Sequence, residues 1–213
     1  MKTLLSAYGQ QYWWPGDTRF EVMTGAVLTQ NTAWRNVQQA LDKLKAAEVL
    51  SPAKMAALSP AQLAGLIRPA GYYNIKAQRL GNLCRFVLQQ GGVTTLAAWS
   101  SERLRRSLLE IKGIGPETAD SILLYAFERP VFVVDAYTRR IFQRLDMIQG
   151  DEPYESLRAM FERGLDADSG LYNELHALIV RHAKSHCGAK ARCRGCCLRS
   201  QCASFVDQAA QKI

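Results

Sequence analysis

The sequence predicts an all-α protein of roughly ten short helices. Apolar residues recur at intervals of three and four along most of the chain, as they do on the buried face of an amphipathic helix. No segment alternates between apolar and polar residues for long, and the one β-like run, VFVV at residues 131–134, is too short to make a sheet. The chain has no internal repeat and no low-complexity linker, so helical packing is expected throughout.

Caps and prolines place the helices along the chain. The segments with helical recurrence are residues 17–29, 33–47, 60–67, 75–90, 101–110, 116–127, 134–145, 154–165 and 170–186. Asp17 is placed to cap the first of them. Ser51-Pro52 and Ser59-Pro60 each start a helix, with serine at the cap and proline in the first turn. Gly71, in the turn RPAGYYN, follows the helix that starts at Pro60.

A Gly-x-Gly turn follows residues 101–110. Gly113 and Gly115 flank Ile114 at a point where Cβ atoms would obstruct a close approach, and Pro116 then opens a helix with the φ angle that a first helical residue needs. The backbone N–H groups at the start of this helix point outward, as an anion site requires. The turn therefore predicts a grip on phosphate.

A single carboxylate follows this turn along the chain. The apolar run VFVV leads directly into Asp135, so the acid is expected at the end of a buried element. Tyr137, Arg139 and Arg140 come shortly after it. A phosphate grip combined with one anchored acid is a pairing that suits many enzymes acting on DNA.

Composition narrows the class of protein. The chain has 213 residues, 48% of them hydrophobic, which is enough for a substantial core in one domain or two small lobes. It has no apolar run of transmembrane length, and its N-terminus lacks the apolar stretch and cleavage pattern of a signal peptide. We therefore expect a cytoplasmic protein, nucleoid-associated in a bacterium, that has no membrane partner.

Positive charge is concentrated near the C-terminus. The net charge is +8, and residues 181–213 contain seven Lys or Arg against Asp207 alone. These basic residues are Arg181, Lys184, Lys190, Arg192, Arg194, Arg199 and Lys212. Such a local excess suits a polyanion, most commonly nucleic acid, although a solvated basic tail has the same composition.

Five of the six cysteines lie in residues 187–202. Four of them have the spacing C-x5-C-x2-C-x5-C: Cys187, Cys193, Cys196 and Cys202. In a reducing compartment this clustering favours metal ligation over disulfides, and four thiolates suit either a structural zinc ion or a [4Fe–4S] cluster. Cys197 is either a spare thiol or an alternative to Cys196. Cys84, in LGNLCRFVLQQ, is predicted to be an inert core cysteine.

Four landmarks in order resemble one known family. LLEIKGIGPETADSILLYA followed by VFVVDAYTRRIF looks like the helix–hairpin–helix and Gly/Pro/Asp signature of the endonuclease III superfamily of DNA glycosylases. GAVLTQNTAW at residues 25–34, GYYNIKA at residues 71–77 and the four-cysteine loop also follow the family's order, so the resemblance covers nearly the whole chain. It implies a two-lobed all-α fold, with one six-helix lobe at residues 18–130 and a second lobe of residues 1–17 and 131–213. The helix–hairpin–helix would occupy about residues 101–127.

The resemblance also implies how DNA is bound. A flipped nucleotide would enter a cleft between the lobes, with Asp135 at its mouth and the hairpin holding a backbone phosphate. Gln30 matches the residue that fills the gap left by that nucleotide. Tyr72 matches the second wedge, against the opposite strand, although it could instead pack on its own lobe. The predicted DNA contacts are Gln30, Tyr72, Lys112, Gly113, Ile114, Gly115, Thr118, Lys190 and Arg192.

Glu117 departs from part of the family. In the bifunctional members, which cleave the DNA backbone through a Schiff base, the residue before the Thr-Ala of the hairpin helix is lysine. A glutamate cannot form an imine, and Lys112 lies on the other side of the hairpin. The sequence therefore predicts a glycosylase without AP lyase activity. Asp135 would stabilise an oxocarbenium-like sugar and align or deprotonate the attacking water.

The aromatic residues indicate a substrate class. WWPxxxxFExxxGAVLTQNT resembles the 3-methyladenine glycosylase branch of the superfamily, which stacks a flipped base between aromatic faces. An N-alkylated purine carries positive charge and is attracted to indole faces, although such tryptophans also occur in ordinary cores. Trp13 and Trp34 would flank the base and Trp14 would shape the pocket. Glu117 would contact the base or orient water, and Lys184 would line the pocket unless it merely ends its helix.

The resemblance favours a [4Fe–4S] cluster over zinc, with a structural and DNA-docking role. The first cysteine interval is one residue shorter than is usual in the family. The expected partner is double-stranded DNA containing a damaged base, bound by a monomer. Two alternatives remain: an endonuclease III-type glycosylase and AP lyase acting on oxidised or mismatched pyrimidines, and a non-catalytic DNA-binding module built from the hairpin and a zinc loop.

Overall fold

The computed structural model describes residues 1–13 and 16–205. Across these ranges the regular structure is helical, and the only pairing of extended backbone is a single bridge between Cys187 and Ala191. The predicted all-α class is therefore confirmed. None of the helices in the described ranges is long and apolar enough to cross a membrane.

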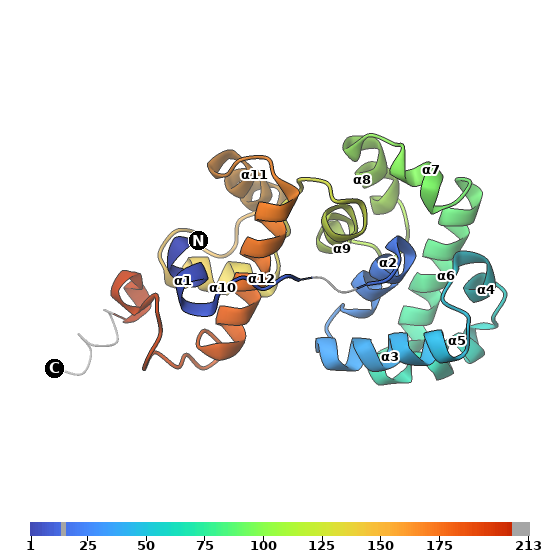
Figure 1. Cartoon of the computed structure of the whole chain (residues 1–213), viewed down its shortest axis with the longest axis horizontal. Helices are drawn as coiled ribbons and strands as arrows, with labels where there is room; N and C mark the ends of the chain where they lie inside the picture. Colours follow the sequence, from blue (N-terminus) through green and yellow to red (C-terminus); the bar gives the residue numbers. More distant parts are fainter. Residues whose placement is uncertain (14–15, 206–213) are drawn as a thin grey trace. The chain divides into compact units, whose positions relative to one another are not determined.

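The chain divides into two compact units (Figure 1). We call residues 15–129 the hairpin unit, and residues 1–14 with 130–213 the cluster unit. The helices of the hairpin unit are α2 Arg19–Leu28, α3 Trp34–Ala46, α4 Pro52–Ala56, α5 Pro60–Leu66, η1 Arg68–Ala70, α6 Tyr73–Gln89, α7 Val93–Ala97, α8 Ser101–Leu109, α9 Pro116–Ser121 and the π-helical turn η2 Ile122–Ala126. Those of the cluster unit are α1 Lys2–Tyr8, α10 Ala136–Arg144, α11 Tyr154–Gly164, α12 Ser169–Ser185 and η3 Arg199–Gln201.

Helix α2 forms the centre of the hairpin unit. Every residue from Phe20 to Leu28 is buried, as expected for a helix that is covered on all sides by α3, α6, α9 and η2. Its N-cap is Thr18, whose hydroxyl accepts a hydrogen bond from the Glu21 amide at 3.1 Å. The prediction that Asp17 caps this helix is wrong, because Asp17 forms an ion pair with Lys45 at 2.8 Å instead.

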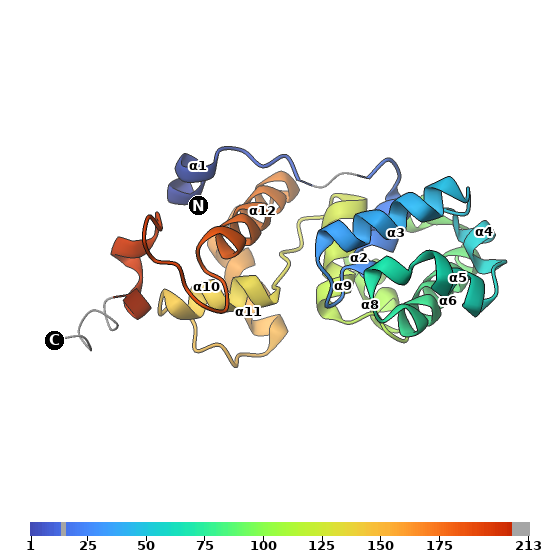
Figure 2. The same ribbon diagram turned by 90° about the horizontal axis from the view of Figure 1, so that it is seen from below.

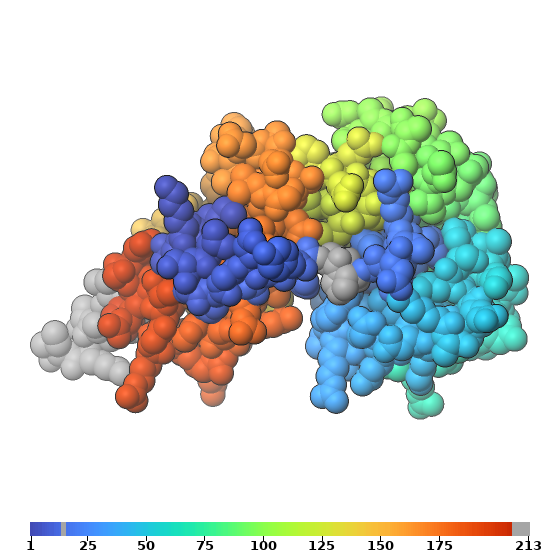
Figure 3. Space-filling view, viewed as in Figure 1, coloured from blue at the N-terminus to red at the C-terminus, as the bar shows by residue number. Residues whose placement is uncertain are grey.

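The cluster unit is built around α12. Helices α1 and α10 both pack against it. Figure 2 shows α10 beside α12, and Figure 3 shows the blue N-terminal segment against the orange atoms of this unit. The β-like run at residues 131–134 is buried but forms no strand. Side chains bond two of its amides: the Phe132 amide donates to Glu162 Oε1 at 3.0 Å and the Val134 amide to the Tyr154 hydroxyl at 3.4 Å. This buried segment delivers Asp135 to the start of α10.

Candidate active site and DNA interface

Only one of the two glycines in the Gly-x-Gly turn occupies a position where the chain itself has no room for a Cβ atom. Gly113 has a φ of 100°, and a Cβ atom there would collide with the Arg79 side chain. Gly115 has an ordinary φ of −94°, and a Cβ atom there would meet open space. Of these two positions, the fold itself therefore requires a glycine only at 113.

Ile114 is held inside the turn. Its side chain is buried, and its amide donates to the Ile111 carbonyl at 3.0 Å. The turn itself thus uses this N–H group, and a contact between Ile114 and phosphate stays a prediction. Lys112 is exposed, and its carbonyl accepts from the Asn82 amide at 2.9 Å. The predicted phosphate grip would then fall to Gly113, Gly115 and the first turn of α9.

Gln30 is bound to this hairpin from inside the same unit. Its amide nitrogen donates to the Gly113 carbonyl at 3.0 Å and to the Thr118 hydroxyl at 2.9 Å, while its amide oxygen accepts from Arg79. Thr118 is buried, so its hydroxyl supports Gln30. The half-buried Gln30 amide has good partners, as an amide in this position requires.

Tyr72 is exposed. The residue is 71% accessible, and its backbone is left-handed, with a φ of 45°, at the N-cap of α6. A bulky residue in this conformation is strained, which the surrounding structure must compensate. The alternative that Tyr72 packs on its own unit does not hold. Glu117, in the first turn of α9, is also exposed, and its carbonyl accepts from the Ser121 hydroxyl at 2.7 Å.

Asp135 is the N-cap of α10 and is almost fully buried. Its Oδ1 atom accepts from the Thr138 amide at 2.7 Å and the Thr138 hydroxyl at 2.9 Å. Its Oδ2 atom lies 3.4 Å from Nε2 of His176 on α12. Burial raises the pKa of Asp135, but the charge and hydrogen bond of His176, together with the Thr138 hydrogen bonds, outweigh burial and hold this pKa below its ordinary value. The carboxylate is therefore ionised at neutral pH.

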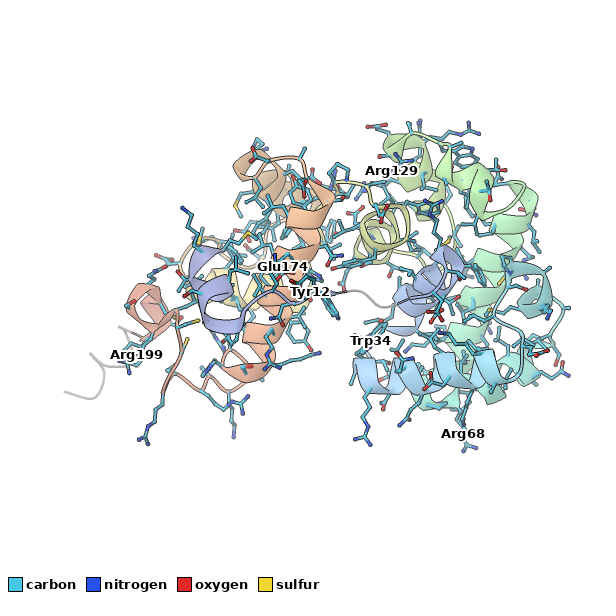
Figure 4. All side chains as sticks on the ribbon, in the orientation of Figure 1. Tyr12, Trp34, Arg68, Arg129, Glu174 and Arg199 are labelled. Atoms are coloured by element: carbon cyan, nitrogen blue, oxygen red, sulfur yellow. The ribbon has the colours of Figure 1, made fainter. Side chains whose placement is uncertain are left out.

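His176 links Asp135 to one predicted base-stacking residue. Its ring centroid lies 5.7 Å from that of Trp13, with 30° between the ring planes. The segment carrying Trp13 is fixed to α12 by a bond from the Gln11 amide to Glu174 Oε1 at 2.7 Å, and Figure 4 shows Tyr12 beside Glu174. His176 was not among the predicted site residues. One feature of the sequence could have indicated it: His176 lies in the apolar stretch ELHALIV, where a buried polar side chain needs a hydrogen-bond partner.

The other predicted pocket residues are more dispersed. Trp34 begins α3 in the hairpin unit and is half-buried (Figure 4). Lys184 is exposed near the C-terminal end of α12, two turns beyond His176. Trp14 lies outside the described residues. In the cluster unit, the structure therefore brings together Trp13, His176 and Asp135.

The four cysteines with regular spacing line one cavity of the cluster unit. Cys187, Cys193, Cys196 and Cys202 face it, together with Arg144 and His182. Arg144 donates to Cys187 Sγ at 3.2 Å, and its carbonyl accepts from the Cys202 thiol at 3.3 Å. His182 Nε2 lies 3.7 Å from Cys196 Sγ. Arg144 and His182 thus contact three of the four thiols.

Two further cysteines lie apart from this cavity lining. The Cys197 thiol is 3.9 Å from His182 Nδ1, which also bonds the Tyr8 hydroxyl at 2.8 Å. Burial raises the pKa of the Cys84 thiol to about 12. Cys84 is fully buried, so its prediction as an inert core cysteine is confirmed.

Two basic residues lie within the cysteine loop. Lys190 and Arg192 are exposed within the first cysteine interval. Arg192 bonds the Lys184 carbonyl at 2.5 Å, and its own carbonyl lies 3.0 Å from His186 Nδ1, so the loop is tied to the end of α12. Lys190 lies at the exposed tip of this loop, where a cation remains available to an anion.

Comparison with known proteins identifies the family. Residues 24–166 match the model of the HhH-GPD superfamily base excision DNA repair proteins. The chain belongs to this superfamily. As an HhH-GPD protein it is a DNA glycosylase of the base excision repair family, and the predicted resemblance to endonuclease III is confirmed.

Individual HhH-GPD relatives cover most of the chain. A candidate DNA repair glycosylase of Methanocaldococcus jannaschii is 47% identical over 206 residues, which are 95% of this chain and 94% of that protein. The H. pylori 3-methyladenine DNA glycosylase bound to 1,N6-ethenoadenine is 33% identical, with a TM-score of 0.74 over 85% of this chain and 91% of that one. An endonuclease III–DNA complex has a TM-score of 0.83 over 98% of this chain and 94% of that one, and at 19% identity it shares the fold.

Proposed function

We propose that the protein is a monofunctional DNA glycosylase that hydrolyses the bond between deoxyribose and an N-alkylated purine such as 3-methyladenine. The observation that carries this proposal is the buried, ionised carboxylate of Asp135 behind Trp13 and His176, combined with glutamate at position 117. The proposed substrate is double-stranded DNA containing the damaged base, bound by a monomer.

Asp135 acts mainly through its charge in this proposal. A carboxylate with a lowered pKa is a weak general base, so its larger contribution is to stabilise positive charge as the sugar becomes oxocarbenium-like. The Oδ1 atom is committed to the helix cap, which leaves Oδ2, on the His176 side, to face the sugar and align water. Water then attacks C1′ and the base departs. No covalent bond to the protein is needed.

The base class follows from the aromatic residues. Trp13 presents an indole beside His176, and Trp34 is the proposed second ring. A cationic alkylpurine gains about 1 kcal/mol or more over a neutral base from stacking on such rings. The same charge makes it a good leaving group, so little general-acid help is required. The 33% identity with the H. pylori 3-methyladenine DNA glycosylase supports this choice. Trp14 and Lys184 are assigned to the pocket margin by the same resemblance.

The cysteine loop is proposed to hold a [4Fe–4S] cluster. Cys187, Cys193, Cys196 and Cys202 line one cavity, but no three His, Cys, Asp or Glu side chains of the described residues are grouped closely enough to hold a single metal ion. A cluster offers a separate iron to each thiolate, whereas zinc requires every sulfur about 2.3 Å from one ion. Base hydrolysis needs no electron transfer, so the cluster supplies a rigid scaffold. Lys190 and Arg192 on its first interval would meet DNA phosphate.

The proposed DNA grip has two parts in the hairpin unit. The amides of Gly113 and Gly115 hold a phosphate beside the exposed Lys112, while Gln30 and Tyr72 enter the duplex on either side of the flipped nucleotide. Tyr72 presents a large exposed ring for this purpose.

Base release from methylated duplex DNA tests the proposal. We expect the wild type to release 3-methyladenine, and Asp135→Asn to lose about 100-fold or more of the single-turnover rate while binding an abasic-site analogue as before. Asparagine keeps the cap on α10 but loses the stabilisation of the ionised carboxylate, so we expect a lowered thermal unfolding midpoint with the variant still folded at the assay temperature. Release of mismatched uracil or thymine without any alkylpurine would refute the substrate class and retain the reaction type. Binding without release of any base would support a non-catalytic module.

Borohydride trapping tests the absence of lyase chemistry. A Schiff base between enzyme and DNA is reduced to a permanent adduct, so an AP lyase is trapped and a monofunctional glycosylase is not. We expect no adduct with the wild type on DNA containing an abasic site. A trapped adduct would favour the endonuclease III-type alternative.

A further inference from the structure

Lys76 is buried in the hairpin unit at the start of α6. Its side chain is 1% accessible, and its ammonium group donates to the Leu28 carbonyl at 2.9 Å, the Ala70 carbonyl at 2.8 Å and the Thr32 hydroxyl at 2.5 Å. These bonds use all three donors of a lysine. All three acceptors are neutral. Lys76 therefore holds two backbone carbonyls and a hydroxyl group in place.

The acceptors lie at the beginnings of two loops: Leu28 ends α2 and Thr32 lies in the loop that follows, while Ala70 ends η1. Leu28 and Thr32 bracket Gln30, whereas Ala70 precedes Gly71 and the exposed Tyr72. The Thr32 hydroxyl donates onward to the Ala70 carbonyl at 2.6 Å, so the two loops are also joined directly. Lys76 therefore fixes the distance between the segments that carry Gln30 and Tyr72.

The same helix reaches the hairpin. Arg79, one turn after Lys76, donates to the Gln30 amide oxygen, and Asn82 donates to the Lys112 carbonyl. Spacing of three residues places these side chains along one face of α6. This polar stripe bonds, in order, the two loops, the Gln30 side chain and the hairpin.

A buried ammonium group is a costly way to fill a core. Burial, and then the charge of Arg79, lower the pKa of Lys76 to about 8, which shows that the charged form is disfavoured there. An apolar side chain of similar length would avoid this cost but would leave the carbonyls of Leu28 and Ala70 without this donor. The lysine is suited to holding two loops in register.

We propose that Lys76 is a positioning residue for base extrusion: it holds the Gln30 and Tyr72 loops at the spacing at which both side chains enter the duplex together. The inference rests on the proposed function, because it takes Gln30 and Tyr72 as the inserted residues. The ammonium group itself contacts no DNA, being enclosed by Leu28, Thr32 and Ala70.

The test measures extrusion separately from chemistry. A 2-aminopurine placed beside an abasic-site analogue becomes fluorescent when it unstacks, and this signal requires no bond cleavage. We expect Lys76→Met to bind undamaged duplex within about twofold of wild type, since the phosphate grip is untouched, but to lose at least about tenfold in single-turnover excision, with a reduced unstacking signal. Lys54→Met, at an exposed lysine of α4, is the matched control and should behave as wild type.

Coupling separates positioning from a general loss of stability. Combining Lys76→Met with Gln30→Ala and Tyr72→Ala should add little to the loss caused by those two substitutions alone, because the lysine acts through them. Additive losses, or an activity loss that merely follows the unfolding temperature, would overturn the proposal. So would wild-type excision and unstacking in Lys76→Met.

Thr32 provides a second route if Lys76→Met does not fold. Thr32→Val removes the hydroxyl that joins both loops while keeping the shape of the side chain, and it should lower unstacking and excision in the same way. Thr32→Ser keeps the hydroxyl and should restore both. Equal behaviour of the two variants would contradict the proposal. A wild type that unstacks the probe but releases no base would refute the proposed function. The unstacking signals of Lys76→Met and Thr32→Val would still decide this inference.

Discussion

Asp135 Oδ2 lies 3.4 Å from His176 Nε2, inside the cluster unit and away from bulk solvent. The other carboxylate oxygen is held by both donors of Thr138. Asp135 lies at the start of α10 and His176 lies on α12. They meet because these two helices pack against each other. The result is a carboxylate whose charge is maintained by named neighbours on both sides, despite its burial.

His176 should determine the pH below which excision is lost. The pKa of Asp135 is lowered, so its carboxylate persists below the ordinary range of an aspartate, and the wild-type rate should show no acid limb from this group within that ordinary range. In His176→Leu burial remains while one stabilising partner is lost, so the pKa of Asp135 rises and the limb moves to higher pH. The measurement is the single-turnover rate against pH.

Thr138→Val is the companion variant for this profile. It removes the hydroxyl donor but keeps the backbone donor, so a smaller shift in the same direction is expected. The stability contribution has the matching sign: a lowered carboxylate pKa stabilises the fold above the unfolded value, and this stabilisation is lost as the pH falls through the folded value. An unchanged acid limb in His176→Leu would exclude control of Asp135 by this histidine.

Position 117 should decide whether a covalent adduct forms. Glu117→Lys places an amine where the family's lyases carry one, and the exposed first turn of α9 tolerates a long side chain. We expect borohydride to trap this variant on DNA with an abasic site, but not the wild type or Glu117→Gln. Trapping of Glu117→Gln would locate the amine elsewhere, and Lys112 would then be the residue to replace.

Local patterns in the sequence predicted much of this molecule. The helical class, the cap and proline signals at Ser51 and Ser59, and the core position of Cys84 all follow from interactions within a few residues. His176 and Lys76 could not be found in this way, because each is explained by partners far along the chain. The same limit applies to Ile114, whose amide is used by a turn that the Gly-x-Gly pattern alone does not define.

Cys196 and Cys197 should differ sharply in iron binding. Cys196 lines the cavity shared with the other three regularly spaced cysteines, whereas the thiol of Cys197 lies beside His182 Nδ1. We expect Cys197→Ser to retain about four iron atoms per chain and the broad absorption of a [4Fe–4S] protein, and Cys196→Ser to lose both. Stoichiometric zinc in the wild type would instead favour a mononuclear site, and iron loss in Cys197→Ser alone would reverse the assignment.

The two glycines of the hairpin should separate folding from DNA binding. Gly113→Ala introduces a Cβ atom into Arg79 at a φ of 100°, so we expect a loss of about 2 kcal/mol or more in the free energy of unfolding. Gly115→Ala meets open space at an ordinary φ, so its stability should stay within about 0.5 kcal/mol of wild type.

Affinity for duplex DNA should follow the opposite order at equal folded fraction. Gly115→Ala places a methyl group where the phosphate is proposed to approach the backbone, so its affinity should fall by about tenfold, with a smaller salt dependence. Gly113→Ala, measured at a temperature where it is fully folded, should bind more tightly than Gly115→Ala. Wild-type affinity in Gly115→Ala would show that phosphate does not approach this glycine, and would move the proposed grip to Lys112 and the first turn of α9.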